Sequence, residues 1–232
     1  MNIALVLSGG TGTRLGGDIP KQYIEVGGRP VVAYCLETLA KSDKIDGIQI
    51  VADIGWHGLL TDTLEKLHAA KKLRGFSEPG ENRQLSIWNG LNDIREYAGD
   101  EDVVLIHDAA RPLLTEEILV KCLEGLRGHD GVMPVLPMKD TVYYSSDGRV
   151  VTKLLDRGCV YAGQAPEAFL LGKYYEANRQ LMPHRILEIK GSTEPAIIFG
   201  LDIAMIPGDE GNFKITTQSD LAKFRMLEEA HI

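Results

Sequence analysis

The chain has 232 residues, 44% of them hydrophobic, which is enough to bury the core of one α/β domain. Its formal net charge of −8 argues against nucleic acid as a partner. No apolar run approaches the roughly 18 residues of a membrane span, and the N-terminus lacks the features of a signal peptide. We therefore expect a cytoplasmic protein that does not bind membranes.

Buried strands and amphipathic helices alternate along the first half of the chain. Short apolar runs predict strands at residues 3–7, 48–52 and 103–106. Apolar residues at helical spacing predict helices around residues 32–39, 60–67, 87–94 and 118–126. Residues 76–84 are expected to form a loop, because proline, glycine and asparagine gather there. This alternation predicts a mostly parallel sheet that is covered by helices on both faces.

The pattern changes after residue 137. Residues 141–144 and 150–154 are rich in strand formers and are joined by Ser-Ser-Asp-Gly, which predicts a hairpin. We expect this segment, at about residues 139–162, to project as an arm that pairs with a second copy of the chain; a flap packed on its own domain is the alternative. A helix near 170–181, a strand at 203–206 and a helix capped by Thr217 complete a single domain spanning 1–232.

Cys35, Cys122 and Cys159 are widely spaced and form no Cys-x-x-Cys pair. Two of them fall within predicted amphipathic helices, so we expect buried, reduced thiols there and no disulfide or metal site.

The first strand leads into a glycine-rich segment. Residues 8–14 read Ser-Gly-Gly-Thr-Gly-Thr-Arg, and Pro-Lys-Gln follows at 20–22. Glycines allow a sharp turn that directs backbone N–H groups into a concavity, and such a concavity binds anions. Arg14 and Lys21 add two positive charges. We interpret this segment as a site for a nucleoside triphosphate; a strand-to-helix turn without a ligand is the alternative.

Two other phosphate-binding motifs do not fit this segment. A P-loop needs Gly-Lys followed by Ser or Thr, which is missing. A dinucleotide-binding loop needs a third glycine at position 15, which is Leu, and an acidic residue about 20 positions later. The acid at the end of the next strand is Asp53, which comes too late.

Several other polar segments follow strands, and strand ends meet at the ligand-binding edge of an open α/β sheet. Asp108 follows the strand at 103–106, where it either holds Mg²⁺ opposite a triphosphate or caps the turn before Arg111. Lys214 either binds an incoming phosphate or is an exposed lysine. Arg83 and Ser86 open a helix, where N–H groups and a hydroxyl can contact a base or an oxyanion. Such groups suit phosphoryl transfer without a covalent intermediate.

The motifs together resemble one family. The glycine segment, Pro-Lys-Gln, His-Asp-Ala-Ala-Arg-Pro at 107–112, Lys-Asp-Thr at 139–141, Asp-Arg at 156–157 and Asn-Phe-Lys-Ile-Thr-Thr at 212–217 are similar in order and spacing to those of the methylerythritol phosphate cytidylyltransferases. The resemblance runs from residue 3 to about 224. It implies a Rossmann-like, doubly wound fold of the nucleotide-diphospho-sugar transferase type, with a homodimer built through the arm.

The same resemblance implies transfer of CMP from CTP to a polyol phosphate, with Mg²⁺ or another divalent cation and release of pyrophosphate. It assigns catalysis to Arg14, Lys21 and Lys214, acceptor binding to Thr141, Arg157 and Lys214, and the metal to Asp108. The residues expected to bind the nucleotide are Leu7, Ser8, Gly9, Gly10, Thr11, Gly12, Thr13, Gly80, Glu81, Arg83, Ser86 and Ala109.

The sequence departs from the family on the acceptor side. Ala165-Pro166-Glu167 stands where the family usually has Thr-Pro-Gln, and residues 192–195 match only in part a stretch that the family usually keeps. We expect 2-C-methyl-D-erythritol 4-phosphate as the acceptor, with ribitol 5-phosphate as the alternative. A nucleotide-binding module without catalysis is the alternative from a different functional class.

Overall fold

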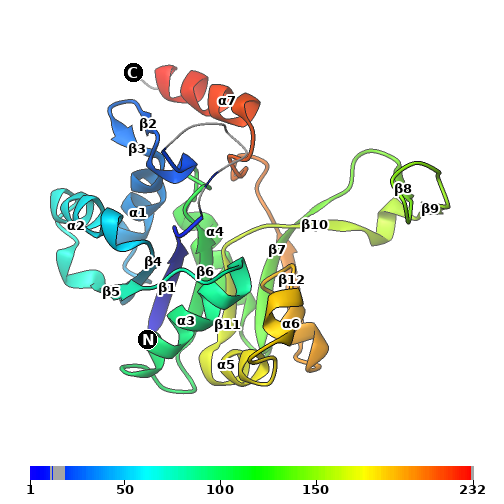
Figure 1. The fold of residues 1–232 in the computed structure, drawn as a ribbon, viewed down its shortest axis with the longest axis horizontal. Helices are drawn as coiled ribbons and strands as arrows, with labels where there is room; N and C mark the ends of the chain where they lie inside the picture. The colour runs from blue at the N-terminus through cyan, green and yellow to red at the C-terminus, as the bar shows by residue number, and fades with distance from the viewer. Residues whose placement is uncertain (11, 13–18, 231–232) are drawn as a thin grey trace.

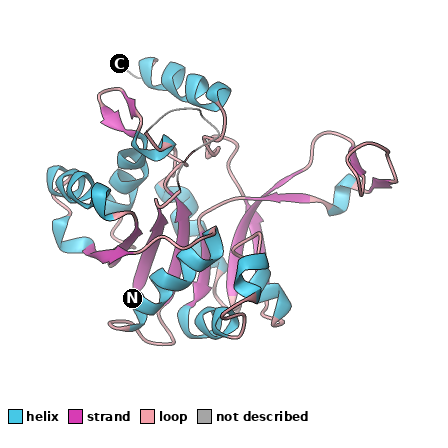
Figure 2. Ribbon diagram, viewed as in Figure 1, coloured by secondary structure: helices cyan, strands magenta, loops and turns pink. Residues whose placement is uncertain are grey.

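The computed structural model describes residues 1–10, 12 and 19–230. In this part of the chain eight strands form one central sheet, which is flanked by helices (Figures 1 and 2). In order across the sheet, the strands are β10 (Tyr161–Gly163), β7 (Gly131–Pro137), β11 (Glu167–Leu170), β6 (Val103–Asp108), β1 (Asn2–Leu7), β4 (Gly47–Val51) and β5 (Leu73–Ser77), while β12 (Ile203–Pro207) pairs with β7.

Strand β1 lies in the middle of the sheet and pairs in parallel with β4 on one side and β6 on the other. Its side chains alternate between two cores. Ala4 and Val6 face one hydrophobic cluster, and Ile3 and Leu5 face the other. A strand that is buried on both faces reads as a continuous apolar run, which is why the sequence identified it.

Helices cover both faces of the sheet, as the sequence predicted. The cluster on one face includes residues of three helices, α1 (Val31–Lys41), α2 (His57–Lys66) and α4 (Glu116–Gly125). The cluster on the other face includes residues of α3 (Arg83–Arg95), α5 (Leu171–Arg179) and α6 (Glu194–Ile198). The doubly wound, mostly parallel α/β fold is therefore confirmed.

The last helix, α7 (Gln218–Glu229), packs outside these layers. Leu221 and Phe224 contact Tyr34 of α1 and the small hairpin of β2 (Glu25–Val26) and β3 (Arg29–Pro30). Thr217 and Asp220 form a capping box at its first turn. Burial alone would raise the pKa of Asp220, but hydrogen bonds from Thr216 and Thr217 outweigh burial and lower the pKa to about 2. The predicted start of this helix is confirmed.

Four strands of the central sheet were not anticipated. Residues 76 and 77 belong to β5 and not to a loop, because they pair with Ile50 and Val51 of β4. The sequence of β5, Leu-Arg-Gly-Phe-Ser, lacks the apolar run of a buried strand. The others are β7, β10 and β11, of which β11 runs antiparallel to β6. These strands are short or interrupted by proline, so strand periodicity is weak in them.

The predicted hairpin projects away from the body of the molecule (Figure 1). Val142–Tyr144 (β8) pairs antiparallel with Lys153–Leu155 (β9). Large apolar side chains on the arm are exposed, with Tyr143 59% and Leu154 60% accessible. An apolar surface of this kind on a projecting segment is typical of a contact with another chain.

Cys35 and Cys122 are buried in α1 and α4, whereas Cys159 is exposed on the arm, and all three are free thiols. Among the described residues no helix has both the length and the apolar character needed to cross a membrane.

Candidate active site

The glycine-rich segment starts where β1 ends. Gly9, Gly10 and Gly12 line a cleft at the carboxyl end of the parallel strands. Gly12 has a φ of +67°, and a Cβ there would lie 2.8 Å from the backbone nitrogen of Lys21. Only glycine adopts this conformation without strain and lets the two backbone segments approach so closely.

The residues after Lys21 hold the first residues of the glycine segment in place. The Gln22 side-chain amide donates hydrogen bonds of 2.7 Å to the carbonyl oxygens of both Ser8 and Gly10. The Tyr23 hydroxyl lies 2.8 Å from Ser8 Oγ, and its ring stacks on Trp56 at 3.9 Å between centroids. Burial raises the pKa of Tyr23 to about 12, so its hydroxyl stays protonated. The turn Lys21–Tyr23 therefore holds Ser8 and Gly10, at the start of the glycine segment, and places Lys21 at the cleft.

A second loop forms the opposite wall of the cleft at the start of α3. Asn82 caps this helix by accepting a hydrogen bond from the Leu85 N–H at 2.7 Å. Ser86 Oγ accepts from the Gly80 N–H at 2.9 Å, which closes the loop on itself. A Cβ on Gly80 would lie 2.6 Å from the Leu85 side chain, so the loop requires glycine there. Backbone N–H groups at a helix N-terminus favour bound anions.

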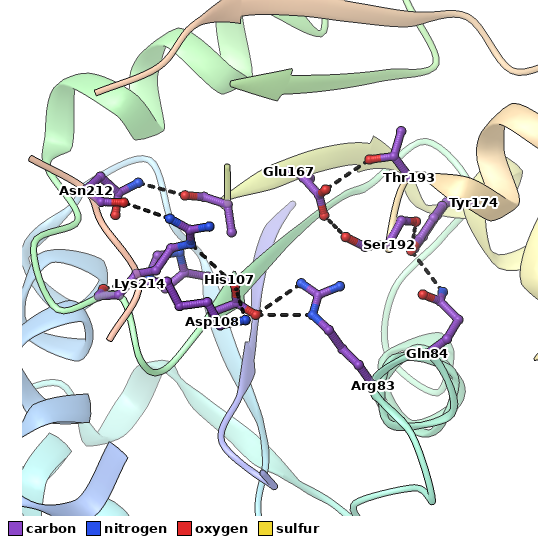
Figure 3. Close-up of polar contacts among 12 residues, drawn as sticks. Arg83, Gln84, His107, Asp108, Glu167, Tyr174, Ser192, Thr193, Asn212 and Lys214 are labelled. Atoms are coloured by element: carbon purple, nitrogen blue, oxygen red, sulfur yellow. Dashed lines mark hydrogen bonds and ion pairs between the residues drawn. The ribbon is translucent and has the colours of Figure 1, made fainter. Parts of the chain in front are cut away.

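Asp108, the last residue of β6, lies at the centre of a group of cations (Figure 3). Its carboxylate is 3.1 Å from Arg83 Nη2, 3.4 Å from Arg111 Nε and 3.0 Å from Lys214 Nζ. These partners come from α3, from the turn after β6 and from the segment after β12. The carboxylate thus draws together three parts of the chain that are far apart in the sequence.

The charges in this group determine its protonation. Burial alone would raise the pKa of Asp108, but Arg83, Lys214 and Arg111 outweigh it and hold the pKa far below its usual range. Asp108 is therefore ionised at neutral pH, and its three cations outnumber it. Burial lowers the pKa of neighbouring His107 to about 4, so this imidazole is neutral. His107 Nε2 lies 3.1 Å from the Arg111 carbonyl oxygen, which gives it a structural contact in the turn.

Three glycines of the glycine segment, the loop before α3 and the Asp108 group enclose one cleft of about 370 Å³. The cleft is lined by polar and apolar surface in similar measure, is open to solvent and is of a size suited to a small ligand. Its lining residues are Leu7, Gly9, Gly10, Gly12, Lys21, Gln22, Gly80, Glu81, Asn82, Arg83, Ser86, Asp108, Ala110, Lys214 and Thr216.

The donor set at the cleft bears on how a metal ion would bind. In residues 1–10, 12 and 19–230, no group of three or more His, Cys, Asp or Glu side chains could hold a metal ion by itself. Mg²⁺ commonly binds through one or two carboxylates together with substrate phosphates and water. The carboxylate of Asp108, which lies beside the glycine segment, fits an ion of this kind.

Most of the predicted site residues lie together, but not all of them. Ser8 and Ala109 are buried and do not line the cleft themselves, although their neighbours in the chain do. Thr141 and Arg157 lie on the arm, where they line a separate hollow with Leu154, Leu155 and Asp156. Thr11, Thr13 and Arg14 lie outside the described residues.

Sequence reasoning missed some polar residues of the site. Arg111 was not assigned a site role, although its position three residues after Asp108 in His-Asp-Ala-Ala-Arg was a usable signal. The cap formed by Asn82 was also missed, although asparagine three residues before an apolar helix position is a typical start signal.

A second buried acid lies near the cleft. Glu167 begins β11, opposite Ile106 of β6, and accepts hydrogen bonds from the hydroxyls of Ser192 and of Thr193, the latter at 2.9 Å. Figure 3 shows it facing the two hydroxyl residues across from Arg83. Burial raises the pKa of Glu167 from 4.5 to about 7, because desolvation outweighs the attraction of Arg83.

Comparison with known proteins identifies a family. The model of the 2-C-methyl-D-erythritol 4-phosphate cytidylyltransferases matches residues 2–228. A protein of that name from Geobacter metallireducens is 34% identical, with 99% of this chain and 96% of the relative covered. A ribitol-5-phosphate cytidylyltransferase from Vibrio parahaemolyticus is 32% identical, with 98% and 95% covered. The crystal structure of a 4-diphosphocytidyl-2C-methyl-D-erythritol synthase from Anaerococcus prevotii superposes with a TM-score of 0.83 at 27% identity. The superposition covers 98% of this chain and 96% of that chain.

The raised pKa of Glu167 predicts a pH-dependent effect of Glu167→Gln on stability. Between about pH 4.5 and 7 the unfolded chain ionises this carboxyl while the folded chain keeps it protonated, so the wild type loses stability as the pH rises through this range. Glutamine mimics the protonated form at every pH. We expect the free energy of unfolding of the variant, relative to that of the wild type, to rise by about 2–3 kcal/mol between pH 4.5 and 8.

Denaturant unfolding of both proteins at pH 4.5, 6 and 8 measures this difference. A stability difference that stays constant with pH would show that Glu167 is not buried in its uncharged form.

Proposed function

Because this chain belongs to the 2-C-methyl-D-erythritol 4-phosphate cytidylyltransferase family, we propose that 2-C-methyl-D-erythritol 4-phosphate is its acceptor and that the cleft at the end of β1 is where CMP is transferred. The chain is a cytidylyltransferase, an enzyme that transfers CMP from CTP to a polyol phosphate and releases pyrophosphate. One observation carries the assignment of the site: the glycine segment, Lys21, Asp108 and Lys214 line a single cleft.

In this reaction a phosphate oxygen of the acceptor forms a bond to the α-phosphorus of CTP, and the bond from that phosphorus to the bridging oxygen of the β-phosphate breaks. The attacking phosphate is already ionised at neutral pH, so no general base is required. Catalysis then depends on positioning and on neutralising negative charge. Lys21 and Arg14 act at the α-phosphate, and Lys214 binds the phosphate of the acceptor.

The nucleotide is held by the two loops that face each other. N–H groups of the glycine segment contact the triphosphate, and the loop from Gly80 to Ser86 contacts the cytidine. Support comes from hydrogen bonds within the described residues of each loop: Gln22 holds Ser8 and Gly10 on one side, and Asn82 and Ser86 hold the start of α3 on the other. Backbone groups that are already held in place when the ligand arrives lose less entropy on binding.

We propose that the divalent cation is held by Asp108 together with phosphate oxygens of CTP. A cation held there would supply additional neutralisation of the negative charge on the phosphates of CTP. Asp108 is suited to this role because its carboxylate is ionised throughout the physiological pH range.

Overall sequence similarity is what favours methylerythritol phosphate over ribitol phosphate as the acceptor. Relatives of both kinds cover nearly the whole chain, so coverage does not separate them. We therefore expect the release of pyrophosphate from CTP, in the presence of Mg²⁺, to be fastest with 2-C-methyl-D-erythritol 4-phosphate. Parallel assays with ribitol 5-phosphate and with no acceptor provide the comparison. Faster turnover with ribitol 5-phosphate would replace the proposed acceptor, and binding of CTP without turnover on either acceptor would favour a nucleotide-binding module.

Lys21→Ala is predicted to lower kcat about 100-fold or more, because it removes a positive charge from the phosphorus under attack. Arg14→Ala is expected to act in the same direction. Lys66→Ala, which removes an exposed lysine from α2, is the matched control and should retain wild-type kcat. Retention of turnover in a folded Lys21→Ala protein would remove this lysine from catalysis.

We propose that the enzyme works as a homodimer in the cytoplasm. The exposed apolar side chains of the arm support pairing with a second subunit. Thr141 and Arg157 of the arm would then contribute to acceptor binding in that subunit. The unpaired thiols support a reducing compartment.

The dimer is testable through the arm. Replacing Tyr143 and Leu154 together by Asp should convert a dimer into a monomer of 25.5 kDa in sedimentation analysis, because a charge at each position opposes apolar contact. Met226→Asp, at a still more exposed apolar position on α7, should leave the dimer intact. A monomeric wild type at micromolar concentration would contradict the proposal.

A further inference from the structure

Lys214 lies in a segment that has little regular structure of its own. Residues 208–217 follow β12 and precede α7, and they form neither helix nor strand. Lys214 is nevertheless held with its ammonium group 3.0 Å from Asp108. The hydrogen bonds that fix this segment therefore decide where the ammonium group lies.

One buried side chain, Gln164, makes several of these bonds. Its Oε1 accepts from the Asp209 N–H at 2.9 Å, and its Nε2 donates to the carbonyl oxygens of Asp209 at 2.9 Å and Asn212 at 3.4 Å. Gln164 is only 6% exposed. It therefore satisfies backbone groups on both sides of the turn that leads to Lys214.

The fit between Gln164 and this segment is close. A Cβ on Gly208 would overlap Gln164 Oε1, so the missing side chain at 208 is what lets the amide reach the turn. The Gly208 N–H also donates to the Val135 carbonyl oxygen of β7 at 2.9 Å. Glycine at 208 thus has a packing reason that is independent of backbone conformation.

The same segment is tied to the Asp108 group through Asn212. Asn212 Nδ2 donates to the Ala165 carbonyl oxygen at 2.7 Å, and the Asn212 carbonyl oxygen accepts from Arg111 Nη1 at 2.8 Å. Arg111 in turn pairs with Asp108. A continuous set of contacts thus joins Gln164 and Ala165 to the carboxylate that Lys214 faces.

Gln164 also belongs to the base of the arm. It directly follows β10, the strand by which the arm returns to the central sheet, and its own N–H donates to the Pro134 carbonyl oxygen at 2.8 Å. The residue therefore connects the paired strands β10 and β7 to the segment that carries Lys214.

We infer that Gln164 is a positioning residue, which fixes the Asp209–Asn212 turn against the base of the arm and thereby holds Lys214 where it binds the acceptor phosphate. This inference rests on the proposed role of Lys214. Gln164 itself is not among the residues that line the cleft, so its effect on the acceptor acts through Lys214.

The test is a double-mutant cycle of Gln164→Met and Lys214→Met. Methionine keeps the volume of glutamine and removes its hydrogen bonds. The readout is the Kd of 2-C-methyl-D-erythritol 4-phosphate, measured by calorimetry with a non-hydrolysable CTP analogue and Mg²⁺ present. We expect Gln164→Met to raise this Kd about 10-fold and to change the Kd of the CTP analogue less than twofold. In the Lys214→Met background, the same substitution should raise the acceptor Kd by less than a further twofold.

Two further variants keep the result interpretable. Gly208→Ala disturbs the same contact from the opposite side and should also raise the acceptor Kd, even if Gln164→Met folds poorly. Gln49→Met is the matched control: Gln49 is buried in β4 and hydrogen-bonds Ser77 and Tyr97 away from the cleft, so it should lower Tm without changing the acceptor Kd.

Three outcomes would overturn the inference. The first is an unchanged acceptor Kd in folded Gln164→Met. The second is a double variant whose increase in acceptor Kd equals the product of the two single increases. The third is an acceptor Kd that Lys214→Met leaves unaltered. Turnover of the wild type with each polyol phosphate tests the proposed function separately, and failure there with both acceptors removes the basis of the inference as well.

Discussion

The buried carboxylate of Asp108 is the constraint around which the site is arranged. A carboxylate inside a protein is costly unless opposite charges and hydrogen bonds compensate its lost hydration. Here Arg83, Arg111 and Lys214 provide that compensation from three separate segments. Because the cations outnumber the carboxylate, the group also leaves positive charge at the cleft in a chain whose net charge is −8. The same arrangement that makes burial of Asp108 tolerable therefore attracts an anionic substrate.

The fold explains why this group forms at one place. Strands β1, β4 and β6 are parallel, so their carboxyl ends share one edge of the sheet. The pairing of Leu7 with Asp108 brings the start of the glycine segment beside the carboxylate. The turn Lys21–Tyr23 and the start of α3 then close the cleft from two sides. The cleft depends on loops, but each loop is anchored to a rigid strand or helix.

The sequence was most informative where one local rule decides the structure. Buried strands such as Ile3–Leu7 have apolar residues at every position, and Thr217 with Asp220 has the spacing of a capping box. The glycine spacing and the acid at the end of β6 likewise identified residues that line the cleft. The sequence failed where pairing decides: β5 and β11 are strands because β4 and β6 lie beside them. Gln164 and Arg111 were not identified as site residues, because their importance lies in contacts with Asn212 and Asp108 that only the folded chain brings together.

The central claim is that the cleft at the end of β1 holds the triphosphate at the phosphorus under attack. A crystal structure of the enzyme with CTP and Mg²⁺ tests this claim most directly. The account predicts the α-phosphate within hydrogen-bonding distance of Lys21 Nζ and of N–H groups of the glycine segment, with the cytosine against the loop from Gly80 to Ser86. A nucleotide bound elsewhere, with Lys21 facing bulk water, would contradict it.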